Sequence, residues 1–339
     1  MTRGVKDNRP TVVSLFAGCG GSSLGYRMAG FRELAAVEWW DVACDTLRRN
    51  FPGTSVIQGD VREQLEAVRI LLDGKELDVL DGSPPCQGFS VANSRERSKK
   101  NIHDVRNDLV SEYIRWVREL QPRMFIMENV RGMVIGPMVA RFNSFLREMQ
   151  ELNYFVQARL VSMAMLGVPQ VRQRVIIVGV RNDIKKKYEF PKPVANNTDY
   201  TKVLDTIKQD EREAAFLCEC ENKTIRELWK GKFKPHNAYF SFSKMKPGKL
   251  IPTLTASGGV FGLASGAFHH AQPRRLTIAE AKLASTFPPG FRFADEDDYF
   301  LRGRREGAKI YGTIMRQIGN CVPPLGIQRI AEKALEVLR

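Results

Sequence analysis

The chain has 339 residues, of which 43% are hydrophobic and 27% charged, and its formal net charge is +14. This composition is typical of a soluble globular protein and excludes a disordered or fibrous chain. No apolar stretch reaches the roughly 18 residues of a membrane-spanning helix, and residues 1–10 lack the apolar core of a signal peptide, so we expect a cytoplasmic protein that contacts no membrane. The basic excess predicts a polyanionic partner, with nucleic acid favoured over an acidic membrane surface.

Short β-type runs alternate with helical runs in the first half of the chain. The predicted strands are residues 11–16, 34–38, 55–58, 77–81, 124–128, 155–160 and 175–180. Amphipathic stretches lie between them, such as residues 109–120, whose apolar side chains recur at helical spacing. This alternation predicts an α/β fold with a doubly wound, mostly parallel sheet that binds its ligands at the carboxyl ends of the strands.

The first predicted strand runs into a glycine-rich turn over residues 16–23. Gly18 and its neighbours let the backbone approach a ligand, but their spacing departs from GxGxxG and so weakens the case for a dehydrogenase. Glu38 ends the second strand about twenty residues later, where an acid commonly binds ribose hydroxyls. Asp60 ends the third strand, and Trp39 offers a stacking face. Together these residues predict a pocket for ribose and adenine rather than isolated surface acids.

The sequence Pro84-Pro85-Cys86-Gln87 follows the predicted strand 77–81. A cysteine in that position is placed to react, although a small buried residue is the ordinary alternative. The chain has six cysteines. They are Cys19, Cys44, Cys86, Cys218, Cys220 and Cys321. Without paired CxxC spacing they predict reduced thiols and no metal, and we interpret His269 and His270 as polar loop residues.

The second half of the chain is basic and punctuated by Pro and Gly. Residues 228–279 contain no Asp or Glu, while aromatic side chains are interleaved with lysines. The basic residues are Lys230, Lys232, Lys234, Lys244, Lys246, Lys249, Arg274 and Arg275. This pattern favours a nucleic-acid groove over a solvated lysine face.

Taken together, the motifs resemble those of DNA (cytosine-5) methyltransferases of the bacterial restriction-modification type, in the same order and over nearly the whole chain. The matching segments are Phe16-Ala17-Gly18-Cys19-Gly20-Gly21, Pro84 to Ser90, Glu128-Asn129-Val130, Gln170 to Arg174, Arg275-Leu276-Thr277 through Phe287-Pro288, and Gly319-Asn320-Cys321-Val322. The resemblance implies the Rossmann-like fold of methyltransferases that use S-adenosyl-L-methionine.

The resemblance also implies roles for individual residues. Carbon 5 of cytosine is a poor nucleophile, so Cys86 would first add to carbon 6 of a base flipped out of double-stranded DNA. Glu128 would protonate or hydrogen-bond ring nitrogen 3, and a raised pKa from burial would suit that role. Arg172 and Arg174 would hold the exocyclic oxygen, order the nucleophile loop (Pro84 to Ser90) and favour the thiolate.

Further contacts follow from the same resemblance. The implied cofactor contacts are Phe16, Gly18, Gly20, Gly21, Glu38, Trp39, Asp60, Val61, Pro85, Leu109 and Asn320. The implied DNA contacts are Gln87, Ser90, Arg95, Arg97, Arg106 and Thr253. We expect the basic segment 90–106 to close on phosphates, an ordinary solvated loop being the alternative. We predict a catalytic and cofactor-binding domain over residues 1–184, completed by residues 305–339, and a small target-recognition domain with a hinge over residues 185–304.

Three functions remain open at this point. The first is a DNA methyltransferase, expected to be a monomer that works beside a cognate restriction endonuclease. The second is the same chemistry on transfer RNA, as in one eukaryotic branch of the family. The third is a non-catalytic DNA-binding homologue. The long segment between Arg181 and Arg274 favours DNA over RNA, and the presence of Cys86 and Glu128 disfavours the third function.

Overall fold

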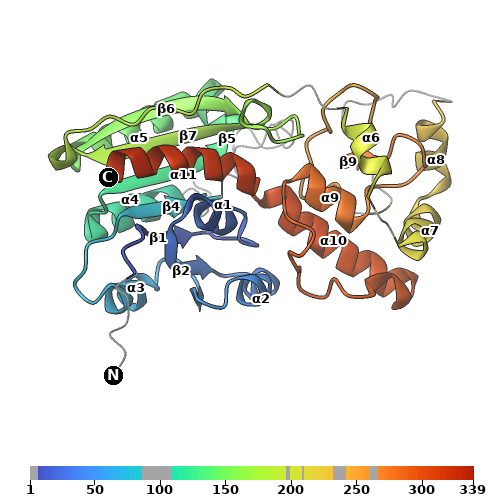
Figure 1. Ribbon diagram of the computed structural model, residues 1–339, viewed down its shortest axis with the longest axis horizontal. Coiled ribbons are helices and arrows are strands. Elements are labelled where there is room, and N and C mark those ends of the chain that lie inside the picture. The colour runs from blue at the N-terminus through green and yellow to red at the C-terminus, as the bar shows by residue number, and fades with distance from the viewer. Residues whose placement is uncertain are drawn as a thin grey trace.

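The computed structural model describes residues 7–85, 108–195, 199–207, 210–231, 242–259, 261 and 266–339, which form two lobes (Figure 1). The first lobe is built on a seven-stranded sheet with the order β3-β2-β1-β4-β5-β7-β6. The strands are β1 (Thr11–Leu15), β2 (Arg32–Glu38), β3 (Ser55–Gln58), β4 (Val79–Gly82), β5 (Met124–Val130), β6 (Tyr154–Ser162) and β7 (Gln173–Arg181). β7 pairs antiparallel with β5 and β6, and the other pairs are parallel. The predicted strands and the doubly wound, mostly parallel sheet are confirmed.

Helices cover both faces of this sheet, which is why its central strands are apolar throughout. The helices of this lobe are α1 (Gly21–Ala29), α2 (Asp41–Asn50), α3 (Leu65–Leu72), α4 (Asp108–Leu120), α5 (Val139–Glu151) and α11 (Pro324–Leu338). One apolar cluster joins the sheet to α1 and α11, and another joins it to α3, α4 and α5. A Cβ on Gly25 would lie 2.6 Å from Cβ of Ile327, so glycine is what lets α1 and α11 pack so closely.

The second lobe contains four short helices, the 17-residue helix α10 and a small sheet among the described residues. Its elements are α6 (Tyr200–Asp205), α7 (Glu211–Cys220), α8 (Lys223–Trp229), β8 (Phe242–Lys244), β9 (Gly266–Phe268), α9 (Ile278–Ala284), the 3₁₀ helix η8 (Tyr299–Leu301) and α10 (Arg304–Asn320). α9 begins with a capping box between Thr277 and Glu280. Our domain prediction assigns residues 305–339 to the first lobe. In the structure α10 contacts α7, α9 and η8, whereas α11 packs along α1.

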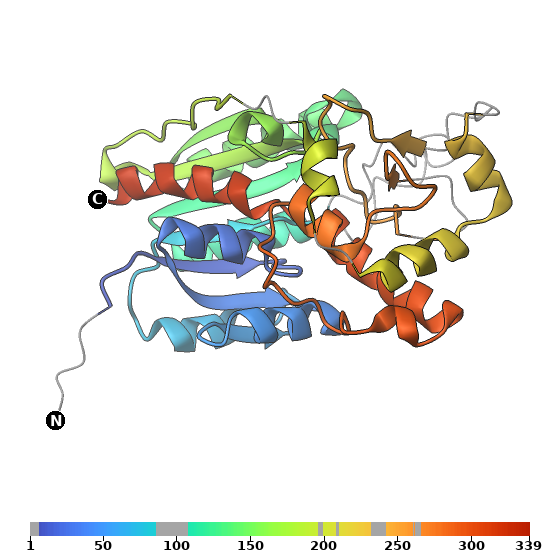
Figure 2. The same ribbon diagram turned by 45° about the vertical axis from the view of Figure 1, so that its right-hand side comes forward.

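The carboxyl ends of the central parallel strands point toward the second lobe, as the arrowheads in Figure 2 show. The loop after β1 shares an apolar cluster with the second lobe, since Ala17 and Cys19 are buried together with Phe287 and Ile318. The fold therefore places the loops that follow the strands against the second lobe. Among the described residues, no helix has both the length and the apolar character needed to cross a membrane.

Two carboxyl groups are buried beneath α1. Glu33 of β2 accepts a hydrogen bond from Ser14 Oγ at 2.7 Å, and Asp81 of β4 accepts one from Tyr26 Oη at 3.2 Å. Burial raises the pKa of Glu33 to about 7 and the pKa of Asp81 to about 8. The folded chain therefore holds protons that the unfolded chain releases at lower pH. The stability that these protons provide is complete in acid and is lost as the pH rises through these values.

We predict that Asp81→Asn removes part of this pH dependence, because asparagine keeps the bond to Tyr26 and never ionises. Between about pH 6 and about pH 8, the free energy of unfolding of the wild type should fall by roughly 2 kcal/mol relative to that of D81N. Urea unfolding over this range measures the difference. The control is Asp45→Asn, since the Asp45 side chain is 60% exposed. The prediction would be contradicted if the free energy of unfolding changed with pH in the same way for D81N and the wild type.

Candidate active site

The loop after β1 has an unusual backbone. Phe16, Gly18 and Gly20 have positive φ angles of 55°, 56° and 89°. A Cβ on Gly20 would lie 2.5 Å from the ring of Phe51, and one on Gly21 would lie 2.3 Å from the carbonyl oxygen of Val322. These glycines are thus required by close packing against α2 and the segment before α11, as well as by the turn itself. We call residues 16–21 the cofactor loop.

Glu38 holds the cofactor loop in place. Its carboxylate accepts hydrogen bonds from the backbone N–H groups of Gly18 at 2.7 Å, Trp39 at 2.9 Å and Trp40 at 2.8 Å. Burial raises the pKa of Glu38, and these three donors act against that shift. Trp39 beside it is 72% exposed. An acid and a free aromatic face therefore lie together at the carboxyl end of β2.

Other predicted cofactor residues lie at the same edge of the sheet. The Gly59 N–H donates to the Glu38 carbonyl at 2.9 Å, which brings the Asp60 turn next to β2. The Asp60 carboxylate accepts from the Arg62 backbone N–H at 2.9 Å. Phe16, Val61 and Leu109 share one apolar cluster. Asn320 is exposed at the end of α10, and Pro85 is half-buried beyond β4.

The predicted nucleophile, Cys86, lies outside the described residues. The same is true of Gln87, Ser90, Arg95, Arg97 and Arg106. Nδ2 of Asn129 donates to the Pro84 carbonyl at 3.2 Å. The start of the nucleophile loop is thus attached to the residue that follows Glu128.

Glu128 and Arg174 form a buried ion pair. Oε1 of Glu128 lies 2.6 Å from Nε of Arg174, and the two side chains are 9% and 14% exposed. The antiparallel register of β5 and β7, in which Val130 pairs with Arg174, produces this contact. The structure therefore brings two of the predicted catalytic residues together.

Arg172 has a different environment. Its guanidinium donates to the carbonyls of Leu254 at 3.1 Å, Gly319 at 3.1 Å and Cys321 at 2.7 Å, and the residue is 3% exposed. Burial lowers its pKa to about 10. Because its bonds go to backbone carbonyls of two separate segments, the loop that contains Leu254 and the end of α10, Arg172 is a positioning residue in this structure. It joins β7 to the second lobe and to the chain before α11.

Neighbouring residues add hydrogen bonds to this contact between the start of β7 and the second lobe, which we call the joint. Gln170 donates to the Ala284 carbonyl at 3.1 Å and accepts from the Leu254 N–H at 3.2 Å. Thr253, a predicted DNA contact, donates its hydroxyl to the Val171 carbonyl. In this arrangement its proton points into the joint and not toward a phosphate.

Sequence reasoning missed Asp81 and Arg316. Asp81 is an acid inside the apolar run that forms β4, and that mismatch is the signal that identifies a buried carboxyl group. The guanidinium of Arg316 lies 4.8 Å from the ring centroid of Trp40, beside Glu38. Nothing in the spacing of α10 indicates that contact.

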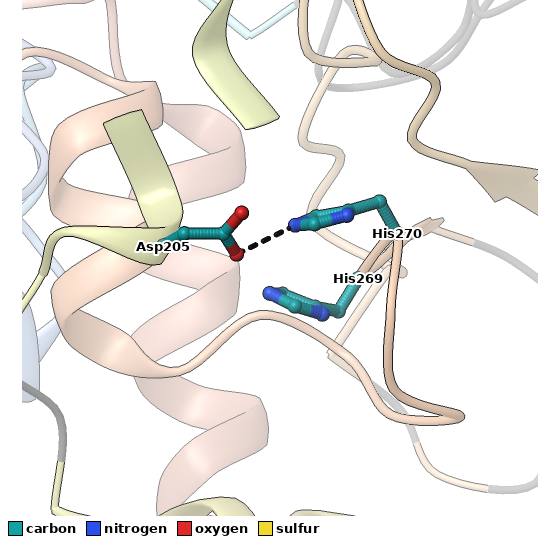
Figure 3. A group of neighbouring side chains, drawn as sticks. All are labelled: Asp205, His269 and His270. Carbon is teal, nitrogen blue, oxygen red and sulfur yellow. Dashed lines mark hydrogen bonds and ion pairs between the residues drawn. The ribbon is translucent and has the colours of Figure 1, made fainter. Parts of the chain in front are cut away.

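Asp205, His269 and His270 offer ligand atoms within 4.8 Å of one another, as Figure 3 shows. Nε2 of His270 lies 2.9 Å from Asp205 Oδ1. Nδ1 of His269 accepts the backbone N–H groups of Ala271 at 3.1 Å and Gln272 at 3.2 Å. Neutral His269 must therefore carry its proton on Nε2, which lies 3.4 Å from Oε1 of Glu280. With no lone pair free toward Asp205, His269 is poorly suited to bind a cation.

We predict that Arg172→Gln lowers stability through its position in the joint. Three buried carbonyls would lose a charged donor, at a cost of roughly 3 kcal/mol in the free energy of unfolding. Thermal and urea unfolding measure this loss. A variant with wild-type stability but no methyl transfer would contradict the positioning role and indicate that Arg172 contacts the substrate.

Comparisons with known proteins agree with this geometry. Residues 10–336 match the family described as C-5 cytosine-specific DNA methylase. The chain is 31% identical over 353 residues to Type II methyltransferase M1.HphI of Haemophilus parahaemolyticus, covering 96% of this chain and 87% of that protein. It is 28% identical over 352 residues to Type II methyltransferase M.NgoFVII of Neisseria gonorrhoeae, covering 97% and 87% of the two chains.

Solved structures show the same fold. A putative DNA modification methyltransferase encoded within an E. coli prophage matches with a TM-score of 0.73 and 24% identity, over 97% of this chain and 99% of that one. A mutant of Spodoptera frugiperda DNMT2 matches with a TM-score of 0.69 and 19% identity, over the same shares. With the family match over most of its length, the chain belongs to the C-5 cytosine-specific DNA methylase family and is a DNA (cytosine-5)-methyltransferase.

Proposed function

We propose that this protein methylates carbon 5 of a flipped cytosine in double-stranded DNA through a covalent adduct between Cys86 and carbon 6. We further propose that it is the modification enzyme of a restriction-modification system with a cognate endonuclease. The observation that carries the proposal is the Glu128–Arg174 pair, which lies beside the anchored start of the Cys86 loop.

The residues at the carboxyl ends of β1 to β3 fit S-adenosyl-L-methionine. Gly18 leaves space for a ligand beside the cofactor loop, since a Cβ there would meet nothing within 4 Å. Glu38 suits the ribose hydroxyls, and Trp39 offers a face for adenine. Asp60 suits the adenine amino group. When bound, S-adenosyl-L-methionine supplies an electrophilic methyl group on a sulfonium.

The protein side of the chemistry follows from the site. The Cys86 thiolate forms a bond to carbon 6, and the electron pair of the ring double bond becomes available at carbon 5. Negative charge develops toward ring nitrogen 3, where Glu128 protonates or hydrogen-bonds the base. Arg174, which contacts Glu128, is assigned to the exocyclic oxygen. After methylation a base removes the proton from carbon 5, and the Cys86 sulfur leaves carbon 6.

The second lobe is assigned to DNA recognition. A hollow of about 410 Å³ there is lined by Phe242, Lys244, Met245, Lys246, Lys249 and Pro252, among others. Nζ of Lys244 lies 3.7 Å from the ring centroid of Trp229. Because residues 228–279 contain no acid, the lysines here face no competing carboxylate from their own stretch of chain. Such a surface suits phosphates.

The predicted division into a catalytic domain and a target-recognition domain belongs to this proposal. We place α10 with the second domain, because it contacts α7 and α9. We further propose that the enzyme is a monomer in the cytoplasm. The loop over residues 90–106 is proposed to close on the bound DNA.

We expect purified protein to transfer labelled methyl groups from S-adenosyl-L-methionine to duplex DNA and not to transfer RNA. Cys86→Ala should lower this rate at least roughly a thousandfold, because the covalent step has no substitute. The control is Cys218→Ser, which changes a half-buried thiol on α7. Transfer of labelled methyl groups to transfer RNA but not to DNA would contradict the proposal that DNA is the substrate.

Trapping of the adduct tests the mechanism separately. In the presence of S-adenosyl-L-methionine, duplex DNA containing 5-fluorocytosine should stay covalently bound to the wild type and to C218S in denaturing electrophoresis. After methyl transfer carbon 5 carries fluorine in place of a proton, so the elimination that releases Cys86 is blocked. C86A should not be retained. Methylation of ordinary DNA without a trapped complex would exclude attack at carbon 6.

We also predict that Lys246 and Lys249 contact DNA phosphates. The double variant K246Q/K249Q should reduce the slope of log affinity against log salt by about 2, since each contact releases about one counterion. The control is K75Q/K333Q, which removes the same charge from the first lobe. Filter binding from low to moderate salt measures both slopes. If both double variants lost the same amount of slope, Lys246 and Lys249 would not be specific phosphate contacts.

A further inference from the structure

The side chain of Arg316 is held near the cofactor loop without an acidic partner. Arg316 is exposed on α10, and its guanidinium lies 4.8 Å from the ring centroid of Trp40, the residue before α2. Within the described part of the chain, Arg316 makes no ion pair and no hydrogen bond through its side chain. Stacking on an indole orients a guanidinium without using its N–H groups. The donors of Arg316 therefore stay available to a ligand.

Two contacts place this turn of α10 against the cofactor loop and α2. The Cys19 thiol donates to the Gln317 carbonyl at 3.6 Å, and Oγ1 of Thr46 donates to Oε1 of Gln317 at 2.8 Å. Asn320, a predicted cofactor contact, is exposed four residues after Arg316, so the two side chains lie on one face of the helix. Arg316 thus lies where α10 meets the cofactor loop.

The order of the strands indicates which end of the cofactor would face Arg316. Strands β3, β2 and β1 are neighbours in that order, and they are followed by Asp60, Glu38 and the cofactor loop. In the proposed binding mode adenine lies by Asp60 and ribose by Glu38, so the methionine moiety extends toward the cofactor loop and β4. That moiety ends in a carboxylate. The turn of α10 that contacts the cofactor loop is therefore on the carboxylate side.

The acidic groups at this edge of the sheet already have partners. Glu38 accepts three backbone N–H groups, and Oδ2 of Asp60 lies 2.9 Å from Nη1 of Arg62. A ligand carboxylate close to these acids needs a cation of its own, and Arg62 is already paired. Arg316 supplies that cation, because a planar guanidinium can give a carboxylate two parallel hydrogen bonds.

We propose that Arg316 binds the carboxylate of the methionine moiety of S-adenosyl-L-methionine and that Trp40 positions its guanidinium. The inference rests on the proposed function, because it deepens the assignment of the cofactor site. A DNA phosphate is the competing anion for an exposed arginine. The two contacts differ in their consequences, since a carboxylate contact acts on cofactor binding without DNA, whereas a phosphate contact acts on DNA binding and its salt dependence.

Calorimetry with two ligands tests the carboxylate contact. S-adenosyl-L-methionine and its decarboxylated analogue differ only in the carboxylate. Without DNA, Arg316→Gln should bind S-adenosyl-L-methionine about tenfold more weakly than the wild type and should bind the analogue with wild-type affinity. The matched control is Arg305→Gln, because Arg305 is exposed about three turns earlier on α10. R305Q should bind both ligands as the wild type does.

A double-mutant comparison tests the role of Trp40. Trp40→Ala should weaken S-adenosyl-L-methionine binding about threefold, because the guanidinium loses the ring that orients it. The double variant W40A/R316Q should bind no more weakly than R316Q alone, since the ring acts through Arg316. Additive losses would overturn the positioning role of Trp40. Thermal unfolding of each variant shows that the measured protein is folded.

Other outcomes separate the proposal from its alternatives. Equal losses of affinity for both ligands in R316Q would overturn the carboxylate contact. Wild-type affinity of R316Q for S-adenosyl-L-methionine, together with weaker DNA binding, would overturn it as well and assign Arg316 to a phosphate. If the wild type itself did not bind S-adenosyl-L-methionine, the proposed function would be contradicted, and this inference with it.

Discussion

The guanidinium group of Arg172 joins segments that are far apart in the sequence. It bonds the carbonyls of Leu254, Gly319 and Cys321, so the start of β7, the second lobe and the chain before α11 meet at one buried charge. A buried guanidinium is costly unless its donors are used, and here backbone carbonyls bind both Nη groups, whereas Nε has no hydrogen-bond partner among the described residues. Separation of these segments would leave the buried charge and the carbonyls without their partners.

The reversed direction of β7 explains how the arginines reach the site. In a parallel strand the amino-terminal end lies at the edge away from the ligands. Because β7 is antiparallel to β5, its first residues lie where β5 ends, and Arg174 meets Glu128 there. Nucleophile loop, acid and arginine thus come from three adjacent elements of one sheet. The cofactor loop comes from β1, on the other side of β4.

The sequence was sufficient to predict the sheet, because parallel strands buried on both faces appear as apolar runs between amphipathic helices. It was sufficient to place Glu128 and Glu38 at strand ends for the same reason. It could not separate Arg172 from Arg174, since two arginines two residues apart look alike until their partners are known. The burial of Asp81 beside Tyr26 was also hidden, because it depends on packing between distant segments. Helices α6 to α9 of the second lobe have only six to ten residues, which is too short for a clear helical periodicity in the sequence.

Buried ion pairs accompany the apolar cluster of the second lobe. Arg274 bonds Glu280 at 2.8 Å, and Arg275 pairs with Glu221 while donating to the Gly258 carbonyl at 2.6 Å. The guanidinium of Arg275 also lies 4.9 Å from the ring centroid of Phe268 in β9. Such pairs add little net stability but specify one arrangement of the loops around them.

These contacts form a continuous path to the reacting groups. Arg275 fixes Gly258, the same loop supplies Leu254 to Arg172, and Arg172 lies two residues before Arg174 and its partner Glu128. A displacement of β9 is therefore resisted at each step by a buried charge that would lose its partner. On the proposed assignment of DNA recognition to the second lobe, this rigidity would hold the bound duplex at a fixed distance from Glu128.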